Sequence, residues 1–358
     1  MERMLTIYVV IPVYKAEKYI AQTLDSVLGQ PYENIRIVCV DDGSPDDSIS
    51  ILRDYERRYE NIHVIRQENG GVSRARNTGI EYVLSVCSDH DYLTFLDADD
   101  LWAKDIAGVF PDVLQDRVDC VGFMYTRCSD DLCAMMPPSR TEEKIIPGGK
   151  DSLWCHGDHH FGAVLYSTAL LGTHGIRFVD GLGYAEDAIF KFVCFYLARQ
   201  IKLVDKVLYC YRINAMSAMH RRKYGTEFMG PVIDGYLKTA DFLEERTGET
   251  ARFCHVLAGV YAIEMCAEHF QKFRTSRKLQ DFLNDNPRFA AVIDAQDRKD
   301  LSAEHQQMYD LYIHSPAKFR LRNYLMGAKR YVMDAAKRVK PIANRAEARR
   351  FPLPNAYL

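Results

Sequence analysis

The sequence predicts an α/β protein with a mostly parallel central sheet that is flanked by helices and followed by a helical C-terminal region. Three observations lead to this prediction. Short apolar runs rich in β-branched residues alternate with helical patterns through residues 6–100. These runs lack the polar alternation of half-exposed strands, which is typical of parallel strands covered by helices on both faces. Beyond residue 225 the periodicity is mainly that of helices.

The first hundred residues contain four expected strands, at 6–13, 35–40, 62–65 and 92–96. Expected helices separate them, at 20–28, from 44 onward and at 72–83. Ile20, Leu24 and Val27 fall on one face of the first helix. Ser44 is the expected N-cap of the second helix and Pro45 its first residue, because both residue types favour helix starts.

The later part of the chain divides into a mixed segment and a helical one. Strands are expected at 118–125, 161–166 and 202–211, with a helix at 187–198. Helices are then expected at 227–246, 250–273, 300–313 and 317–340. We therefore predict a nucleotide-binding domain at 1–220, a helical region at 221–314, and a basic helix and tail at 315–358.

Composition excludes several classes of protein. The chain has 358 residues, of which 47% are hydrophobic and 27% charged, so a disordered or fibrous protein is excluded. The net charge of −3 argues against a nucleic-acid binder. None of the 10 cysteines forms a C-x-x-C pair, and no run is apolar for long enough to span a bilayer. We therefore expect reduced thiols and a cytoplasmic location.

The C-terminal tail differs from the rest of the chain in charge. Between residues 315 and 351, eleven Lys and Arg face two acidic residues, a net of +9, which leaves −12 for the remainder. A basic amphipathic helix in 315–350 is suited to contact with an anionic membrane surface. The alternative is a helix that packs on the acidic body of the protein, and the sequence leaves both open. We also expect a homodimer, since the helical region is apolar.

An acidic cluster, Asp97–Ala98–Asp99–Asp100, follows directly after the fourth strand. Three carboxylates this close repel one another unless a cation or hydrogen-bond donors neutralise them. Oxygen ligands of this kind suit Mn²⁺ or Mg²⁺. The bound ion would take its remaining ligands from waters and substrate phosphates. The alternative is a helix N-terminus, where Asp is also favoured.

Two further motifs follow other strands of the expected sheet. Asp41 and Asp42 come directly after the second strand, where a carboxylate can accept a hydrogen bond from a nucleotide base or ribose. Gly70–Gly71 opens a helix that carries Arg74 and Arg76, and guanidinium groups match diphosphate oxygens. The usual G-x-G-x-x-G is missing, so a Rossmann dehydrogenase is excluded. Because parallel strands end at one edge of a sheet, these motifs predict a single nucleotide-binding crevice.

Taken together, the motifs resemble those of family 2 glycosyltransferases of the GT-A fold, in particular enzymes of bacterial polysaccharide synthesis. A fifth motif, around Glu186–Asp187, resembles the family's Glu-Asp pair, and Tyr209–Arg212 resembles the segment that often follows it. The resemblance extends over about residues 5–220. The motifs are Val9–Tyr14, Val40–Ser44, Arg74–Gly79, Phe95–Asp100 and Gly183–Phe190.

The resemblance assigns roles to individual residues. The base and ribose of a nucleoside-diphosphate sugar would contact Pro12, Val13, Tyr14, Asp41 and Asp42. The resemblance also implies that Arg74, Asp97 and Ala98 contact the nucleotide-sugar donor. Asp97 and Asp99 would bind the metal. Asp187 would be the general base and Glu186 would steady it, while Arg212 would approach the leaving diphosphate.

These roles imply a metal-dependent inverting transferase that moves a sugar, by family resemblance from UDP, to a glycan or lipid-linked acceptor. Two alternatives stay open. A sugar-phosphate nucleotidyltransferase uses a similar sheet, but generally has a Gly-rich basic loop where this chain has Pro12–Lys15. A non-catalytic assembly subunit would bind the nucleotide sugar without turnover. The histidine-containing segment 156–160 fits no standard zinc pattern and is expected to be a polar loop on the acceptor side.

Overall fold

The computed structural model describes residues 4–130, 134–136, 142–149, 160–182, 185–213, 226–248 and 254. The helices expected at 300–313 and 317–340 lie outside these residues, as does most of the helix expected at 250–273. The predicted domain boundaries at 220 and 314 also lie outside them. The membrane contact through 315–350 and the homodimer therefore stay predictions.

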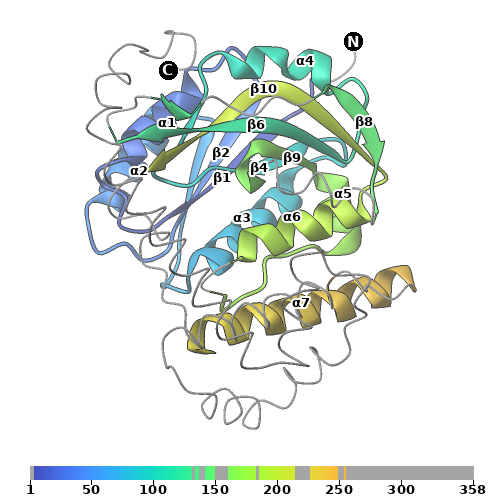
Figure 1. The fold of residues 1–358 in the computed structure, drawn as a ribbon. Coiled ribbons are helices and arrows are strands. Elements are labelled where there is room, and N and C mark those ends of the chain that lie inside the picture. The colour runs from blue at the N-terminus through green and yellow to red at the C-terminus, as the bar shows by residue number, and fades with distance from the viewer. Residues whose placement is uncertain are drawn as a thin grey trace, which may run out of the picture. The chain divides into compact units, whose positions relative to one another are not determined.

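The chain alternates strands and helices through its first hundred residues (Figure 1). Each strand and helix expected there is present, with small changes of length. In chain order they are β1 (Ile7–Val13), α1 (Ile20–Leu28), β2 (Ile35–Asp41), α2 (Ser48–Arg58), β3 (Ile62–Arg66), α3 (Val72–Val86) and β4 (Tyr92–Phe95). The later elements of this part are β5 (Leu101–Trp102), η1 (Ile106–Val109), α4 (Phe110–Val113), β6 (Cys120–Ser129), β7 (Ala134–Met136), β8 (Lys144–Pro147), η3 (Phe161–Ala163), β9 (Val164–Ser167), α5 (Thr168–His174), α6 (Glu186–Leu197) and β10 (Gln200–Ile213).

The ten strands form one mixed sheet with the order β3-β2-β1-β4-β9-β6-β10-β5, and β7 and β8 pair with β6 and β10. The first four strands are mutually parallel, as are β6 and β10. The connecting strand β9 and the short strands β5, β7 and β8 run antiparallel to their partners. The predicted α/β class with a central sheet and flanking helices is confirmed.

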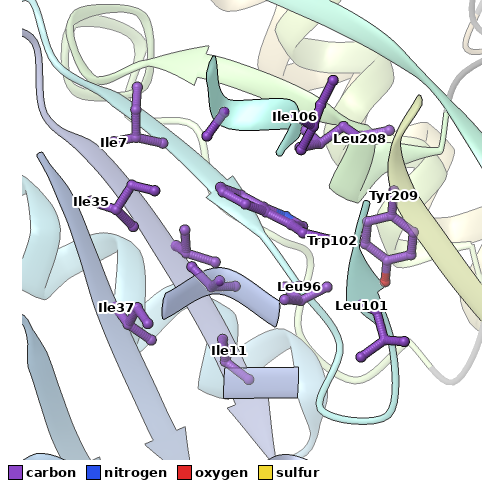
Figure 2. Packing of buried hydrophobic residues seen from close by; sticks show 14 of the residues in the cluster. Ile7, Ile11, Ile35, Ile37, Leu96, Leu101, Trp102, Ile106, Leu208 and Tyr209 are labelled. Atoms are coloured by element: carbon purple, nitrogen blue, oxygen red, sulfur yellow. The ribbon is translucent and has the colours of Figure 1, made fainter. Parts of the chain in front are cut away.

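Every residue of β1 is buried, and since alternate residues of a strand point to opposite faces of the sheet, both faces are covered here. Ile7, Val9 and Ile11 belong to one large apolar cluster that also includes residues of α1, α2 and β10. Figure 2 shows Ile7 and Ile11 in this cluster together with Leu208 and Tyr209 of β10. Val10 points the other way, towards α3. There a side-chain carbon added to Gly79 would lie 2.3 Å from Val10 Cγ1. The absence of a side chain at Gly79 therefore lets α3 approach the sheet closely.

The start of α2 differs from the prediction. The helix begins at Ser48 and its N-cap is Asp47, so the expectation of a Ser44 cap is wrong. The hydroxyl of Ser44 instead accepts a hydrogen bond of 3.2 Å from the backbone N–H of Lys15. The Ser44 hydroxyl, which was expected to cap the helix, is therefore used in a contact with the loop after β1.

The strand expected at 161–166 begins as a short 3-10 helix, η3, and only then continues as β9. Gly162 lies in this 3-10 helix, and a side chain there would meet Tyr209 and the carbonyl of Phe95. The chain crosses its neighbours closely there before it joins the sheet.

The elements up to β10 belong to one compact unit, and α7 (Thr226–Thr247) belongs to a second. Within α7, Val232, Tyr236, Ala240 and Leu243 are buried at helical spacing. The helix expected at 227–246 is thus confirmed. No helix in the part of the chain that the structure describes is both long and apolar enough to cross a membrane.

Candidate active site

The ends of three neighbouring strands bring the predicted motifs together. In the sheet order, β1 lies between β2 and β4, and Val13 is in register with Asp41. The N–H of Asp42 donates to the carbonyl of Val13 at 2.8 Å, and the N–H of Leu96 donates to that of Val10 at 3.0 Å. The motifs after β1, β2 and β4 therefore meet at one edge of the sheet.

At the end of β1, Pro12 and Val13 are buried within the strand. Tyr14 differs, because 47% of its surface is exposed. Lys15 follows with a left-handed backbone, φ 55°, which is unusual for a residue other than glycine. The turn exposes the Tyr14 ring at the strand end, where a base could stack on it.

Asp41 is fully buried at the end of β2. Its Oδ1 accepts a hydrogen bond of 3.2 Å from the N–H of Ser44. Its Oδ2 lies 3.3 Å from Nε of Arg66, but accepts no hydrogen bond from the described residues. Asp41 thus has a buried carboxylate oxygen that can still accept a hydrogen bond.

Asp42 is also buried, but its carboxylate is already engaged. Its Oδ1 accepts from Nε2 of Gln67 at 2.7 Å and from the N–H of Gly70 at 2.9 Å. Its Oδ2 accepts from the N–H of Gly71 at 2.8 Å. Asp42 therefore holds the Gly70–Gly71 turn at the start of α3 and links the second motif to the third.

The acidic cluster forms a loop after β4 in which the four residues have different environments. Asp97 and Asp99 are half-buried, whereas Ala98 is buried and accepts a hydrogen bond of 2.9 Å from the hydroxyl of Thr23. Asp100 is buried and accepts from the hydroxyl of Tyr209 and from the N–H of Arg212. Burial, followed by the charges of Asp99 and Asp97, raises the pKa of Asp100 well above its ordinary value.

Arg212 is buried beneath this loop. Its Nε donates to the carbonyl oxygen of Asp99 at 2.7 Å, and its Nη2 donates to Oε1 of Gln22 at 2.9 Å. Its guanidinium carbon lies 4.9 Å from the centre of the Tyr19 ring. These contacts hold the acidic loop, so Arg212 has a structural role beside the one predicted for it.

The sequence patterns predicted Arg76 only as one of two guanidinium groups on the third helix and indicated no role of its own in the site. Its Nη2 lies 2.8 Å from Oδ1 of Asp97, and its Nη1 lies 3.1 Å from Oε1 of Glu186. Burial acts to lower the pKa of Arg76, but Asp97 and Glu186 outweigh it, so the pKa is raised and the side chain stays charged. Arg74, the residue that was predicted, is exposed on the same helix. The helical spacing could have indicated that Arg76 points inward, since it lies on the same helix face as the apolar residues Ile80 and Val83.

Glu186 and Asp187 form the first turn of α6. Burial, and then the charge of Asp187, raises the pKa of Glu186, although Arg76 opposes the shift. Asp187 Oδ1 accepts a hydrogen bond of 2.7 Å from the N–H of Ala188. Residues 183 and 184 of the fifth motif lie outside the described residues. Through Arg76 the structure nevertheless connects this motif to the acidic loop.

His160 is a second residue that was not predicted individually. Its ring lies 4.3 Å, between centres, from that of Tyr209, and its Nδ1 accepts from the N–H of Gly162 at 3.3 Å. Burial lowers its pKa to about 4, against the opposing charges of Asp97 and Asp187. The imidazole is therefore neutral at pH 7. The rest of the predicted 156–160 loop lies outside the described residues.

The donor groups of the acidic loop fit a divalent cation in part. Among the residues that the structure describes, no group of three or more His, Cys, Asp or Glu side chains is arranged to hold a metal. Asp97 and Asp99 nevertheless add to the negative potential that raises the pKa of Asp100, and a cation would relieve this repulsion. Two carboxylates suit Mg²⁺ or Mn²⁺ that completes its ligands with water and phosphate.

Comparison with known proteins finds similarity to glycosyltransferases. The family model described as "Glycosyl transferase family 2" matches residues 8–167. The uncharacterized glycosyltransferase EpsJ of Bacillus subtilis is 31% identical over 216 residues, which are 58% of this chain and 61% of EpsJ. The minor teichoic acid biosynthesis protein GgaB of the same organism is 38% identical over 109 residues, 30% of this chain and 11% of GgaB. The chain thus spans less than two thirds of either relative.

Among solved structures, residues 1–349 of Staphylococcus aureus TarS in complex with UDP-GlcNAc superimpose with a TM-score of 0.63. The identity is 21%, and the match covers 92% of each chain. This similarity supports the fold, while the match of residues 8–167 to the family model and the curated relatives show that this part of the chain is similar to glycosyl transferase family 2.

Proposed function

We propose that the chain is a metal-dependent inverting glycosyltransferase. It would move a sugar from a nucleoside-diphosphate donor, with UDP the first candidate, to a hydroxyl group of a glycan or lipid-linked acceptor. The setting would be the synthesis of a cell-surface polysaccharide. The observation that carries the proposal is the pair of ion pairs made by Arg76, which join the acidic loop after β4 to the Glu186–Asp187 pair of α6.

Several observations support the choice of donor. The ends of β1, β2 and β4 offer an exposed ring at Tyr14 and a buried carboxylate oxygen at Asp41 that can accept a hydrogen bond. A uracil base presents an N–H donor and a flat face, so these groups are complementary to it. The TarS structure of the same fold was solved with UDP-GlcNAc, and GgaB is named for teichoic acid biosynthesis, which supports a UDP donor and a cell-surface product.

The reaction would break the bond between the anomeric carbon of the sugar and the diphosphate oxygen. The acceptor hydroxyl would form the new bond from the opposite face, and its proton would pass to the carboxylate of Asp187. Glu186, held by Arg76, would keep Asp187 in place at the start of α6. In this proposal the donor would lie at the strand ends and the base at the start of α6.

Asp97 and Asp99 would hold the cation together with the donor diphosphate. When bound, the ion stabilises the negative charge that develops on the leaving nucleoside diphosphate. The hydrogen bonds from Thr23 and Arg212 to the backbone of this loop keep the two carboxylates at the end of β4.

The test measures thermal stabilisation and turnover across a panel of nucleotide sugars, each with Mn²⁺ or Mg²⁺. Acceptor mixtures are included. Asp99→Ala is expected to lose metal-dependent stabilisation by the donor. Asp187→Asn is expected to keep that stabilisation and to lose about 100-fold or more in turnover, because general base catalysis contributes at least that much. Asp112→Asn, an exposed carboxylate on α4 that belongs to no motif, is the matched control.

The outcomes separate the alternatives. Stabilisation by a nucleotide sugar without turnover, even with acceptors, would indicate a non-catalytic binding subunit. Turnover of a sugar phosphate with a nucleoside triphosphate would indicate a nucleotidyltransferase. If no nucleotide sugar stabilises the wild type, the site assignment itself is wrong.

A further inference from the structure

Arg76 is a buried cation that joins parts of the site from three distant segments of the chain. Its side chain is 4% exposed and comes from α3, whereas Asp97 follows β4 and Glu186 begins α6. One terminal nitrogen contacts each carboxylate, at 2.8 and 3.1 Å. The planar guanidinium group thus spans two acidic groups at once, which the single ammonium of a lysine does less well.

Two aromatic rings lie beside this guanidinium group. Its central carbon lies 4.4 Å from the centre of the Phe161 ring and 5.2 Å from that of Phe178. The Phe178 ring is itself stacked on Phe190 of α6, with centres 4.0 Å apart and an angle of 3° between the rings. A cation held in this way has little freedom to move and is shielded from water, so its two ion pairs keep a fixed geometry.

The two carboxylates depend on Arg76 to different degrees. The acidic loop has other restraints on its backbone, because Thr23 donates to the carbonyl of Ala98 and Arg212 donates to that of Asp99. For Glu186, the side-chain hydrogen-bond donor among the described residues is Arg76. Loss of Arg76 should therefore disturb Glu186 and its neighbour Asp187 more than it disturbs the loop.

We infer that Arg76 is a positioning residue that holds the donor-side carboxylate of Asp97 and the base-side carboxylate of Glu186 in one fixed arrangement. This inference rests on the proposed function, since it gives Arg76 a part in the same transfer reaction. Arg76 touches neither donor nor acceptor in this role. It acts through the two carboxylates and so sets the position of Asp187 relative to the bound donor.

The experiment compares steady-state transfer by the wild type with that by Arg76→Met, Arg76→Lys, Glu186→Gln and the double variant Arg76→Met/Glu186→Gln. Arg76→Met should lower kcat by about 100-fold, as expected for misplaced catalytic groups, while KM for the donor changes by about threefold or less. Arg76→Lys should recover part of the lost kcat, because it keeps the charge. The double variant should be no more than about threefold slower than Arg76→Met, because coupled residues are not additive.

Arg57→Met is the matched control, since Arg57 also pairs with a carboxylate on a helix, but at the exposed surface of α2. Its kcat should equal that of the wild type. An Arg76→Met protein with wild-type kcat, or fully additive effects in the double variant, would overturn the positioning role alone. If Arg76→Met does not fold, the same cycle is run with Arg76→Lys. A wild type that transfers no sugar from any donor would overturn the proposed function, and this inference with it.

Discussion

The guanidinium Nε of Arg212 donates a hydrogen bond of 2.7 Å to the carbonyl oxygen of Asp99, within the loop that carries the predicted metal ligands. Arg212 lies at the end of β10, 113 positions after Asp99 along the chain. Its backbone N–H also donates to Asp100 at 2.7 Å. One residue of a distant strand thus supports two consecutive positions of the acidic loop.

Replacement of Arg212 by Met should destabilise the fold as well as the site. The variant leaves the carbonyl of Asp99 and the amide oxygen of Gln22 without their donor, and the free energy of unfolding should fall by about 2–4 kcal/mol. Urea unfolding measures the change. Arg127→Met on the neighbouring strand is the control, because Arg127 is exposed, and it should change stability by less than about 0.5 kcal/mol. Unchanged stability with lost turnover would instead favour a direct contact of Arg212 with the leaving diphosphate.

Replacement of Gly79 by Ala should push α3 away from the sheet. The added carbon would lie 2.3 Å from Val10 Cγ1, so the free energy of unfolding should fall by about 1–3 kcal/mol. Because α3 also carries Arg74 and Arg76, the shift should lower transfer activity. Gly172→Ala on α5 is the matched control, since its nearest neighbour would be 3.7 Å away.

A second substitution tests the steric cause of this effect. Val10→Ala removes the clashing methyl groups, so in the Gly79→Ala background it should cost less stability than in the wild type. The expected coupling is about 1 kcal/mol or more. Additive losses would show that the close contact between Gly79 and Val10 is not the cause.

The strands and the shared edge of the site were predictable because they depend on local patterns and on the geometry of parallel sheets. Apolar runs marked β1, β2 and β4, and acidic residues directly after them had to lie near one another. The short antiparallel strands were not predictable, since β5 and β7 have only 2 and 3 residues. Their pairing depends on distant partners.

The side-chain partners within the site were less predictable than its location. A pair of arginines two positions apart suggested donor contacts, but the helix turns Arg74 outward and Arg76 inward. Likewise the carboxylate of Asp42 binds the Gly70–Gly71 turn, because the end of β2 lies beside that turn in space. Such contacts join residues about 28 or more positions apart, and no local pattern specifies them.

His160 provides a pH-dependent test of the buried site. Burial lowers the pKa of its imidazole to about 4 in the folded protein, from 6.5 in the unfolded chain. Below pH 6.5 the unfolded chain takes up a proton that the folded protein does not bind until about pH 4. The folded state therefore loses stability as the pH falls through this window, by up to about 2 kcal/mol between pH 7 and pH 5.

The measurement is the free energy of unfolding in urea at pH 7 and at pH 5, for the wild type and for His160→Phe. The substitution keeps an aromatic ring beside Tyr209 and removes the titrating group. The free energy of unfolding at pH 7 can therefore differ from that of the wild type, but its fall between pH 7 and pH 5 should be smaller. His63→Phe is the matched control, because His63 also stacks on a tyrosine, Tyr82, but its side chain is 47% exposed. That variant should keep the wild-type pH dependence. An unchanged slope in His160→Phe would show that folding does not lower the pKa of the His160 imidazole.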